Sequence, residues 1–148
     1  MTTNLFQTQD YKALMQEHMT KTIAYLFSKD QEFAIACEMK YVNFNPPLSD
    51  DILDTFKEIA LFVLSGYTYE SATLEEDIFS FEAGFGSQNI GSIVTVPLLA
   101  IKQIIIEEYP IMLNLAQPMS QKRFSDKHSM EILLSNPENQ KLLKKKRP

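Results

Sequence analysis

Residues 78–97 constrain the fold of this chain more than any other segment, because apolar and polar residues alternate along its first half. Phe79, Phe81, Ala83 and Phe85 alternate with serine, glutamate and glycine. Alternation with period two is typical of a strand that buries one face and leaves the other open. The segment therefore predicts a β-strand in a chain that builds its core around a sheet.

A glycine-bounded loop follows this strand and leads into a second one. Gly86 and Gly91 enclose a Ser-Gln-Asn sequence, and Val94 and Val96 flank a threonine. This spacing predicts two antiparallel strands joined by a turn. Pro97 comes next, and its missing N–H suits the first position of a helix. Because the segment carries no catalytic group, we expect either a binding surface or a wall of a barrel.

The other segments predict a mainly β domain with flanking helices. In the first half we expect a helix over 8–28 with Thr8 as its N-cap, a strand over 32–44 and a short helix from Ser49. A strand buried on both faces over 58–64 and a strand with alternating side chains over 67–74 should follow. Beyond the central segment we expect a helix over 98–108, unless Ile104–Ile106 makes a strand there, and a last strand over 111–115. Short strands joined by turns and flanked by helices predict a small, partly open β-barrel.

The first predicted helix has more apolar surface than one stripe requires. One face holds Tyr11, Leu14, Met15, His18, Thr22, Tyr25 and Leu26. Met19, Ile23 and Phe27 widen this surface. The helix either packs only on its own domain or uses the surplus apolar face to form a dimer.

Charge is divided unequally between the body of the chain and its end. The 148 residues have a net charge of −5, yet residues 121–148 hold eight Lys or Arg against three acids. The first 120 residues hold six basic and sixteen acidic residues. An acidic body with a basic tail predicts two functional parts. The body lacks the positive surface that a nucleic-acid platform needs, so we expect no nucleic-acid partner.

The single cysteine and the composition of the chain favour a cytoplasmic location. Cys37 cannot form an internal disulfide, which is typical of a reducing compartment. The first residues carry neither a basic residue nor an apolar run, so we expect no signal peptide. No stretch has the roughly 20 apolar residues that a membrane helix needs, and we expect no membrane partner. We expect Cys37 to be a buried, inert thiol.

No pattern along the chain predicts catalysis. The sequence holds no nucleophile–base set and no cofactor motif. The spaced glycines Gly84, Gly86 and Gly91 lack the Lys-Ser/Thr of a phosphate loop. His18 and His128 have no neighbouring Cys or His to complete a metal site. We therefore expect no enzyme activity, no cofactor and no metal.

Two motifs in the central segment resemble the stringent starvation protein B (SspB) family, whose members are adaptors that deliver tagged substrates to the ClpXP protease. They are Phe-x-Ala-x-Phe-Gly at 81–86 and Val-x-Val-Pro-Leu at 94–98. The order of elements over about residues 8–117 is similar to that of the alphaproteobacterial branch, as is the Ala-Ile-Lys step at 100–102. The chain departs from that branch at 63–69, where the branch is rich in Gln and carries a Trp.

This resemblance implies a fold, a peptide groove and a homodimer. The fold is an Sm-like, partly open barrel over residues 1–118, with a flexible tail over 119–148. The groove binds extended degradation tags, such as the ssrA tag, through Leu64, Ser65, Tyr67, Tyr69, Phe81, Ala83, Phe85, Gly86, Val94 and Val96. The dimer forms through the N-terminal helix, at Tyr11, Leu14, Met15, His18 and Thr22.

The resemblance also implies that the tail docks on the N-terminal domain of ClpX. The docking residues would be Leu142, Leu143, Lys144 and Lys145. Three interpretations of the basic run 141–147 stay open, namely docking, a solubilising end and nucleic-acid contact. Phe81 and Phe85 belong either to the core or to the groove, and Ser65-Gly66 is either a bend or part of the groove. The alternative function is an Sm-like RNA-binding module.

Overall fold

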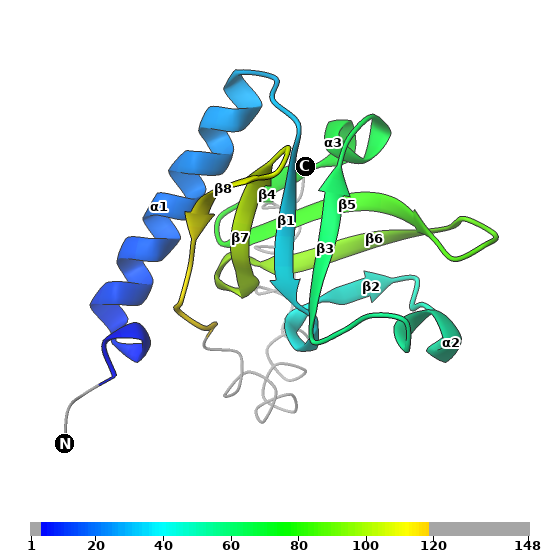
Figure 1. The fold of residues 1–148 in the computed structure, drawn as a ribbon, viewed down its shortest axis with the longest axis horizontal. Coiled ribbons are helices and arrows are strands. Elements are labelled where there is room, and N and C mark those ends of the chain that lie inside the picture. Colours follow the sequence, from blue (N-terminus) through cyan, green and yellow to red (C-terminus); the bar gives the residue numbers. More distant parts are fainter. Residues whose placement is uncertain (1–3, 119–148) are drawn as a thin grey trace, which may run out of the picture. The chain divides into compact units, whose positions relative to one another are not determined.

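Two antiparallel four-stranded sheets and a long N-terminal helix make up the part of the chain that the computed structural model describes, residues 4–118 (Figure 1). The chain divides into two units between Gln117 and Pro118, and every described helix and strand lies in the first unit. The prediction of a mainly β domain with flanking helices is confirmed. The predicted tail, with its docking residues Leu142, Leu143, Lys144 and Lys145, lies outside the described residues.

The two sheets are joined by two bent connections. The first sheet has the order β3 (Ile59–Leu64), β1 (Phe33–Glu38), β7 (Ile101–Ile106), β8 (Tyr109–Leu113). The second has the order β2 (Asn43–Asn45), β6 (Ile90–Pro97), β5 (Ile78–Phe85), β4 (Thr73–Glu75). The helices are α1 (Gln9–Ser28), α2 (Asp50–Leu53) and α3 (Tyr67–Ser71), with 3-10 turns η1 (Leu5–Gln7), η2 (Met39–Tyr41) and η3 (Leu98–Ala100). Since η2 links β1 to β2 and η3 links β6 to β7, one bent antiparallel ribbon runs through both sheets.

Helix α1 begins where it was predicted but turns a different face to the core. The Thr8 side chain accepts a hydrogen bond from the Tyr11 amide, as an N-cap does. The buried stripe consists of Met19, Ile23 and Leu26, whereas the other residues of the predicted face are half-buried or exposed. Leu14 and Tyr25 are 59% and 60% exposed. Within residues 4–118, no helix combines the length and the apolar composition that crossing a membrane requires.

The prediction of a helix over 98–108 is wrong, and the alternative strand is right. Pro97 ends β6 instead of starting a helix, and β7 follows one 3-10 turn later. Ala36 pairs with Gln103 and Cys37 pairs with Ile101, so β7 has one extra residue, Lys102, in a bulge that places Ile101 and Ile104 on the same buried side. Buried residues three apart imitate the helical period, which explains the error.

The strand predicted over 67–74 is also wrong, because the chain turns at Gly66. This glycine has φ +57° and ψ −132°, a conformation that other residues rarely adopt. One helical turn, α3, follows and places Tyr69 in the core, and the strand β4 begins only at Thr73. The strand predicted over 32–44 is likewise interrupted, by η2.

Strand β3 lies where a strand was predicted, but only one of its faces is buried. Ala60, Phe62 and Leu64 face the core, and the three alternate residues Ile59, Leu61 and Val63 are exposed. The continuous apolar run suggested burial on both faces. No described element covers the outer face of β3.

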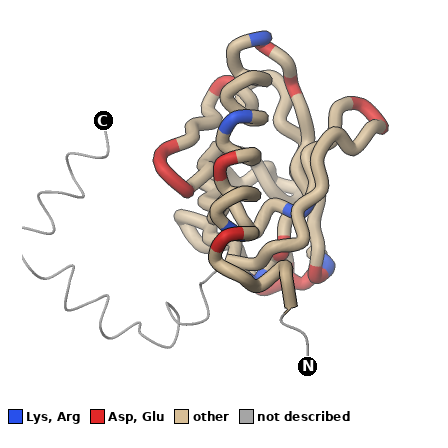
Figure 2. The backbone as a smooth tube through the Cα atoms, turned by 90° about the vertical axis from the view of Figure 1, so that its left-hand side faces the viewer, with Lys and Arg blue, Asp and Glu red and all other residues tan. Residues whose placement is uncertain are grey.

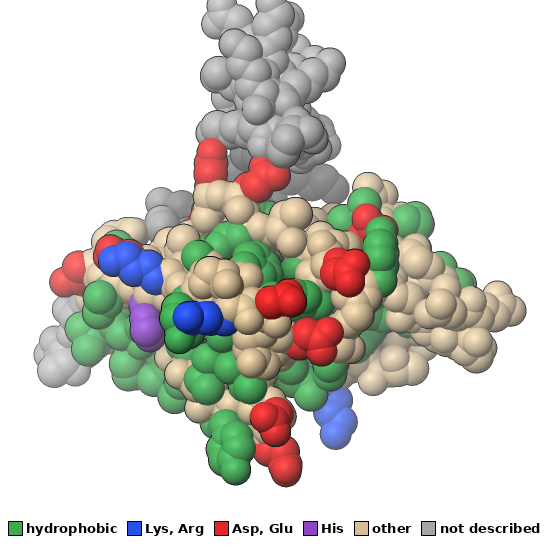
Figure 3. Space-filling model, turned by 90° about the horizontal axis from the view of Figure 1, so that it is seen from above, with side chains coloured by type: hydrophobic (Ala, Val, Ile, Leu, Met, Phe, Trp, Pro, Cys, Tyr) green, Lys and Arg blue, Asp and Glu red, His purple; other side chains and the backbone are tan. Residues whose placement is uncertain are grey.

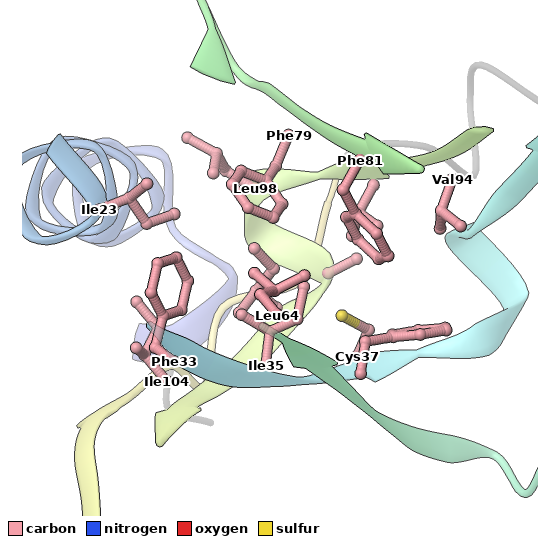
Figure 4. Close-up of a cluster of buried hydrophobic side chains, with 14 of the residues drawn as sticks. Ile23, Phe33, Ile35, Cys37, Leu64, Phe79, Phe81, Val94, Leu98 and Ile104 are labelled. Atoms are coloured by element: carbon pink, nitrogen blue, oxygen red, sulfur yellow. The ribbon is translucent and has the colours of Figure 1, made fainter. Parts of the chain in front are cut away.

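The core consists of two groups of aromatic rings that meet on β5 (Figure 4). Phe79 contacts the rings of Phe27 and Phe33, which lie at the α1 end of the core. Phe81 contacts Phe62, whose neighbours include Phe56 and Phe85. The Phe79 and Phe81 rings are themselves 5.8 Å apart. Cys37 lies buried beside this core, and burial raises the pKa of its thiol well above the ordinary value, so the prediction of a buried thiol is confirmed.

A buried amide fastens the end of β8 to η3. The Asn114 side-chain nitrogen donates to the carbonyl oxygens of Leu99 and Ile101 at 3.0 Å each. Its side-chain oxygen accepts from the Ala116 amide at 2.8 Å. The amide group therefore supplies hydrogen bonds to backbone groups that lie far from water.

We predict that Asn114→Asp lowers the free energy of unfolding by at least about 3 kcal/mol at pH 7, because a carboxylate cannot donate to the Leu99 and Ile101 carbonyls. Urea denaturation followed by circular dichroism measures the change. Asn43→Asp, at an exposed position of β2, is the matched control and should change stability by less than about 0.5 kcal/mol. Equal effects of the two substitutions would contradict the role assigned to Asn114.

Candidate functional site

A hollow of about 510 Å³ lies on the outer face of the second sheet, between α3 and the end of β2. Its floor is formed by Gly84 of β5 and Gly91 of β6, which lie directly opposite each other. A Cβ atom at Gly91 would meet no atom within 4 Å, whereas a Cβ at Gly84 would collide with the Asn89 side chain. Gly91 therefore leaves open space in the hollow, whereas the Asn89 side chain covers Gly84.

The floor faces outward because β5 and β6 direct their alternate residues into the core. Phe81 and Val94 oppose each other on the buried face. The intervening positions, including Glu82 and Ile93, are exposed and stand beside the two glycines. The alternation that predicted the strands thus also decides which residues line the hollow.

Two hydrogen bonds fix α3 as the wall of the hollow. The Tyr67 hydroxyl donates to a Glu82 carboxylate oxygen at 3.0 Å, and the Glu82 amide donates to the Ser71 hydroxyl at 2.8 Å. The Gly66 amide donates to the Glu32 carboxylate at 2.8 Å, which holds the start of α3. The hydrogen bond from Tyr67 to Glu82, together with the negative charge of Glu82, raises the pKa of the Tyr67 hydroxyl above its ordinary value.

The edge of β5 beside α3 is open past the end of β4. Strand β4 pairs only with Ile78–Ser80. The Glu82 amide points to α3, and because main-chain groups alternate in direction along a strand, those of Gly84 point the same way. Within residues 4–118 no strand pairs with that part of the edge. The site therefore offers main-chain groups of Gly84 at an open strand edge, beside the bare position of Gly91.

The domain that carries the hollow has more acidic than basic residues. Residues 4–118 contain six basic and sixteen acidic residues, and Figure 2 shows how few basic positions lie along the backbone. Several acidic side chains gather on the face seen in Figure 3, the side on which α3 lies in Figure 1. Glu82 brings a carboxylate to the hollow itself.

The structure separates the predicted groove residues into two groups. Five of them are core residues whose side chains cannot contact a ligand at the surface, and this corrects the prediction for Leu64, Tyr69, Phe81, Val94 and Val96. Tyr67 and Ala83 line the hollow. Ser65, two residues before Tyr67, is exposed. Phe85 packs against Phe44 and Phe56, so it belongs mainly to the core.

Gly86 lies in the turn that joins β5 to β6, with φ +77°. The site residues that sequence reasoning missed include Glu82, Gly91 and Ile93. They occupy the outward positions of the same two strands, so attention to the polar half of the alternation would have found them.

The residues predicted for a dimer lie on the open side of α1. Leu14 and His18 are exposed, and Tyr11, Met15 and Thr22 are partly buried. A shallow depression of about 310 Å³ lies among Leu14, Met15 and His18. The structure thus leaves this helix face free, and it contains one chain only.

Within residues 4–118 there is no group of three or more His, Cys, Asp or Glu that could hold a metal ion. Comparison with protein-family models, with curated proteins and with solved structures found no match to this chain.

We predict that Tyr67 ionises at a higher pH than an ordinary tyrosine, because its hydroxyl donates to Glu82. The difference in absorbance near 295 nm between the wild type and Tyr67→Phe gives its titration curve. Glu82→Gln should move that curve to lower pH by removing the negative charge beside the hydroxyl. A Tyr67 titration that Glu82→Gln does not alter would contradict the bond.

Proposed function

We propose that this chain is a non-enzymatic adaptor that binds peptide tags, such as the ssrA tag, and delivers the tagged proteins to the ClpXP protease. The observation that supports it most is the hollow floored by Gly84 and Gly91. The resemblance of the 81–98 segment to the SspB family provides the identity of the ligand and the protease in this proposal.

An extended peptide matches the two properties of the site. Because Gly91 carries no side chain and has open space above it, a peptide backbone can approach the sheet closely at that point. Gly84 directs main-chain groups to the open edge of β5, where an added strand would find hydrogen-bond partners. Ile93 and Tyr67 stand on opposite sides of the floor and would contact alternate side chains of the peptide.

The proposed delivery works by tethering. In this proposal the residues 119–148 connect the peptide site to ClpX, with Leu142, Leu143, Lys144 and Lys145 as the contact with its N-terminal domain. Two weak contacts joined by a linker raise the effective concentration of the substrate at the protease to the mM range. In a homodimer, each of these two contacts would be present twice. The proposal also assigns the domain to the Sm-like type of barrel. The acidic surface of residues 4–118 disfavours the alternative of an RNA-binding module.

We predict that Gly91→Val weakens binding of a fluorescently labelled ssrA-type peptide at least tenfold, because the new side chain fills the floor of the hollow. The change should leave folding intact, since Gly91 has no positive φ and a Cβ there meets no atom within 4 Å. Fluorescence anisotropy measures the affinity, and thermal unfolding verifies the fold. Thr95→Val, on the same outward face of β6 but outside the hollow, is the control and should bind as the wild type does.

Two further variants separate peptide binding from delivery. Deletion of residues 119–148 should preserve peptide affinity and abolish the acceleration of degradation by ClpXP. The pair Leu142→Ala and Leu143→Ala should do the same, whereas Leu133→Ala and Leu134→Ala in the same tail should not. If the wild type fails to bind the tag, the adaptor proposal is overturned. If Gly91→Val binds normally, the site lies elsewhere on the chain.

A further inference from the structure

Strand β3 has an edge that carries none of the usual protection against pairing with another strand. It pairs with β1 on one side, and within residues 4–118 no strand lies on the other (Figure 1). The sequence Ile-Ala-Leu-Phe-Val-Leu contains no charge and no proline. Its register with β1 continues without a bulge from Ile59 to Leu64. Natural proteins usually protect a free strand edge with a charged residue, a proline or a bulge. An apolar edge that lacks all three aggregates unless another chain or segment covers it.

The outward side chains of β3 are apolar and largely open. Ile59, Leu61 and Val63 are 46%, 56% and 61% exposed. Next to them on β1 lie the small residues Ala34 and Ala36. Three neighbouring apolar side chains beside two alanines make a smooth apolar surface at the very edge of the sheet.

The same three residues present their main-chain groups to the free edge. The Met39 amide donates to the Glu58 carbonyl at 2.9 Å, so Glu58 faces β1. Main-chain groups alternate along an antiparallel strand, and the pairing from Phe33–Leu64 to Glu38–Ile59 continues that register. The even-numbered residues of β3 therefore bond to β1, and Ile59, Leu61 and Val63 direct their N–H and C=O groups away from it.

We propose that β3 pairs with β3 of a second copy of this chain, antiparallel, about a two-fold axis at Leu61. In this register Leu61 opposes Leu61 of the partner subunit, and each Ile59 opposes a Val63. All the opposed residues are those with free main-chain groups, so about six main-chain hydrogen bonds form across the axis. The exposed side chains become cross-strand neighbours on one face. The result is a continuous eight-stranded sheet with two-fold symmetry.

Charge favours a second copy at this edge and disfavours it elsewhere. Residues 4–118 hold sixteen acidic residues against six basic ones, so two copies repel each other over most of their surface. The outward face of β3 and β1 has one acidic residue, Glu38, whose carboxylate lies 3.1 Å from the Lys102 ammonium group. At the edge of β3, two acidic domains can therefore meet without placing like charges opposite each other. This contact is separate from the open face of α1 and from the peptide hollow.

The first test measures the mass of the full chain in solution by light scattering and sedimentation over a range of concentrations. The wild type should be a dimer at micromolar concentration. Leu61→Lys and Leu61→Glu should each weaken self-association at least 100-fold, because like charges would meet on the axis. An equimolar mixture of these two variants should dimerise again. Leu14→Lys, at an equally exposed position of α1, is the control and should remain a dimer.

The second test checks the register by oxidation of single cysteines. Leu61→Cys should form a disulfide-linked dimer, because the two Cα atoms of a hydrogen-bonded pair lie about 5.5 Å apart. Val63→Cys should not, since its counterpart in the partner would be about 13 Å away along the strand. Cys37 is fully buried and gives no background.

Three outcomes overturn the proposal. One is a wild type that stays monomeric at about 100 μM. Another is dissociation caused by Leu14→Lys but not by Leu61→Lys, which assigns the dimer to α1. The third is a monomer in which Leu61→Lys abolishes binding of the ssrA-type peptide, which assigns this edge to an extended ligand. None of these outcomes depends on Gly91, so a failure here is distinguishable from failure of the proposed peptide site.

Discussion

Contact between the Phe79 and Phe81 rings holds the core of this domain together. Phe79 belongs to the ring group at α1, and Phe81 belongs to the group that contains Phe62. Because β5 buries both rings on one face, the alternate residues of the strand, including Glu82 and Gly84, must point outward. The position of the hollow is a consequence of that burial, since Gly84 is one of these outward residues.

The two surfaces with proposed functions share one physical origin, which is an unpaired strand edge. Among the strands of residues 4–118, none pairs with β5 past Ser80, because β4 is short, and none pairs with the outer edge of β3. The edges differ in their surroundings. Glu82 and the bonded α3 make the β5 edge polar and partly covered, whereas the β3 edge is apolar and unprotected. We therefore assign the first edge to a peptide ligand and the second to a copy of the chain.

The errors of the sequence predictions have particular causes in the structure. A bulge at Lys102 made a strand look helical, because it brought buried residues three positions apart onto one face. The twist at Gly66 turned an alternating segment into one helical turn. For α1, both faces of the helix carry apolar residues, and only the packing of Met19 and Ile23 on the sheets decided which face is buried.

The sequence by itself determined the β-rich class, the strands β5 and β6, the start of α1 and the burial of Cys37, because each depends on local periodicity, capping or composition. Tertiary structure alone decided which face of α1 and of β3 is open, and that Gly84 meets Gly91. Those properties depend on the register of strand pairing and on which elements pack against each face. Neither is encoded by the spacing of residues within one segment, so the candidate site emerged only when distant segments were brought together.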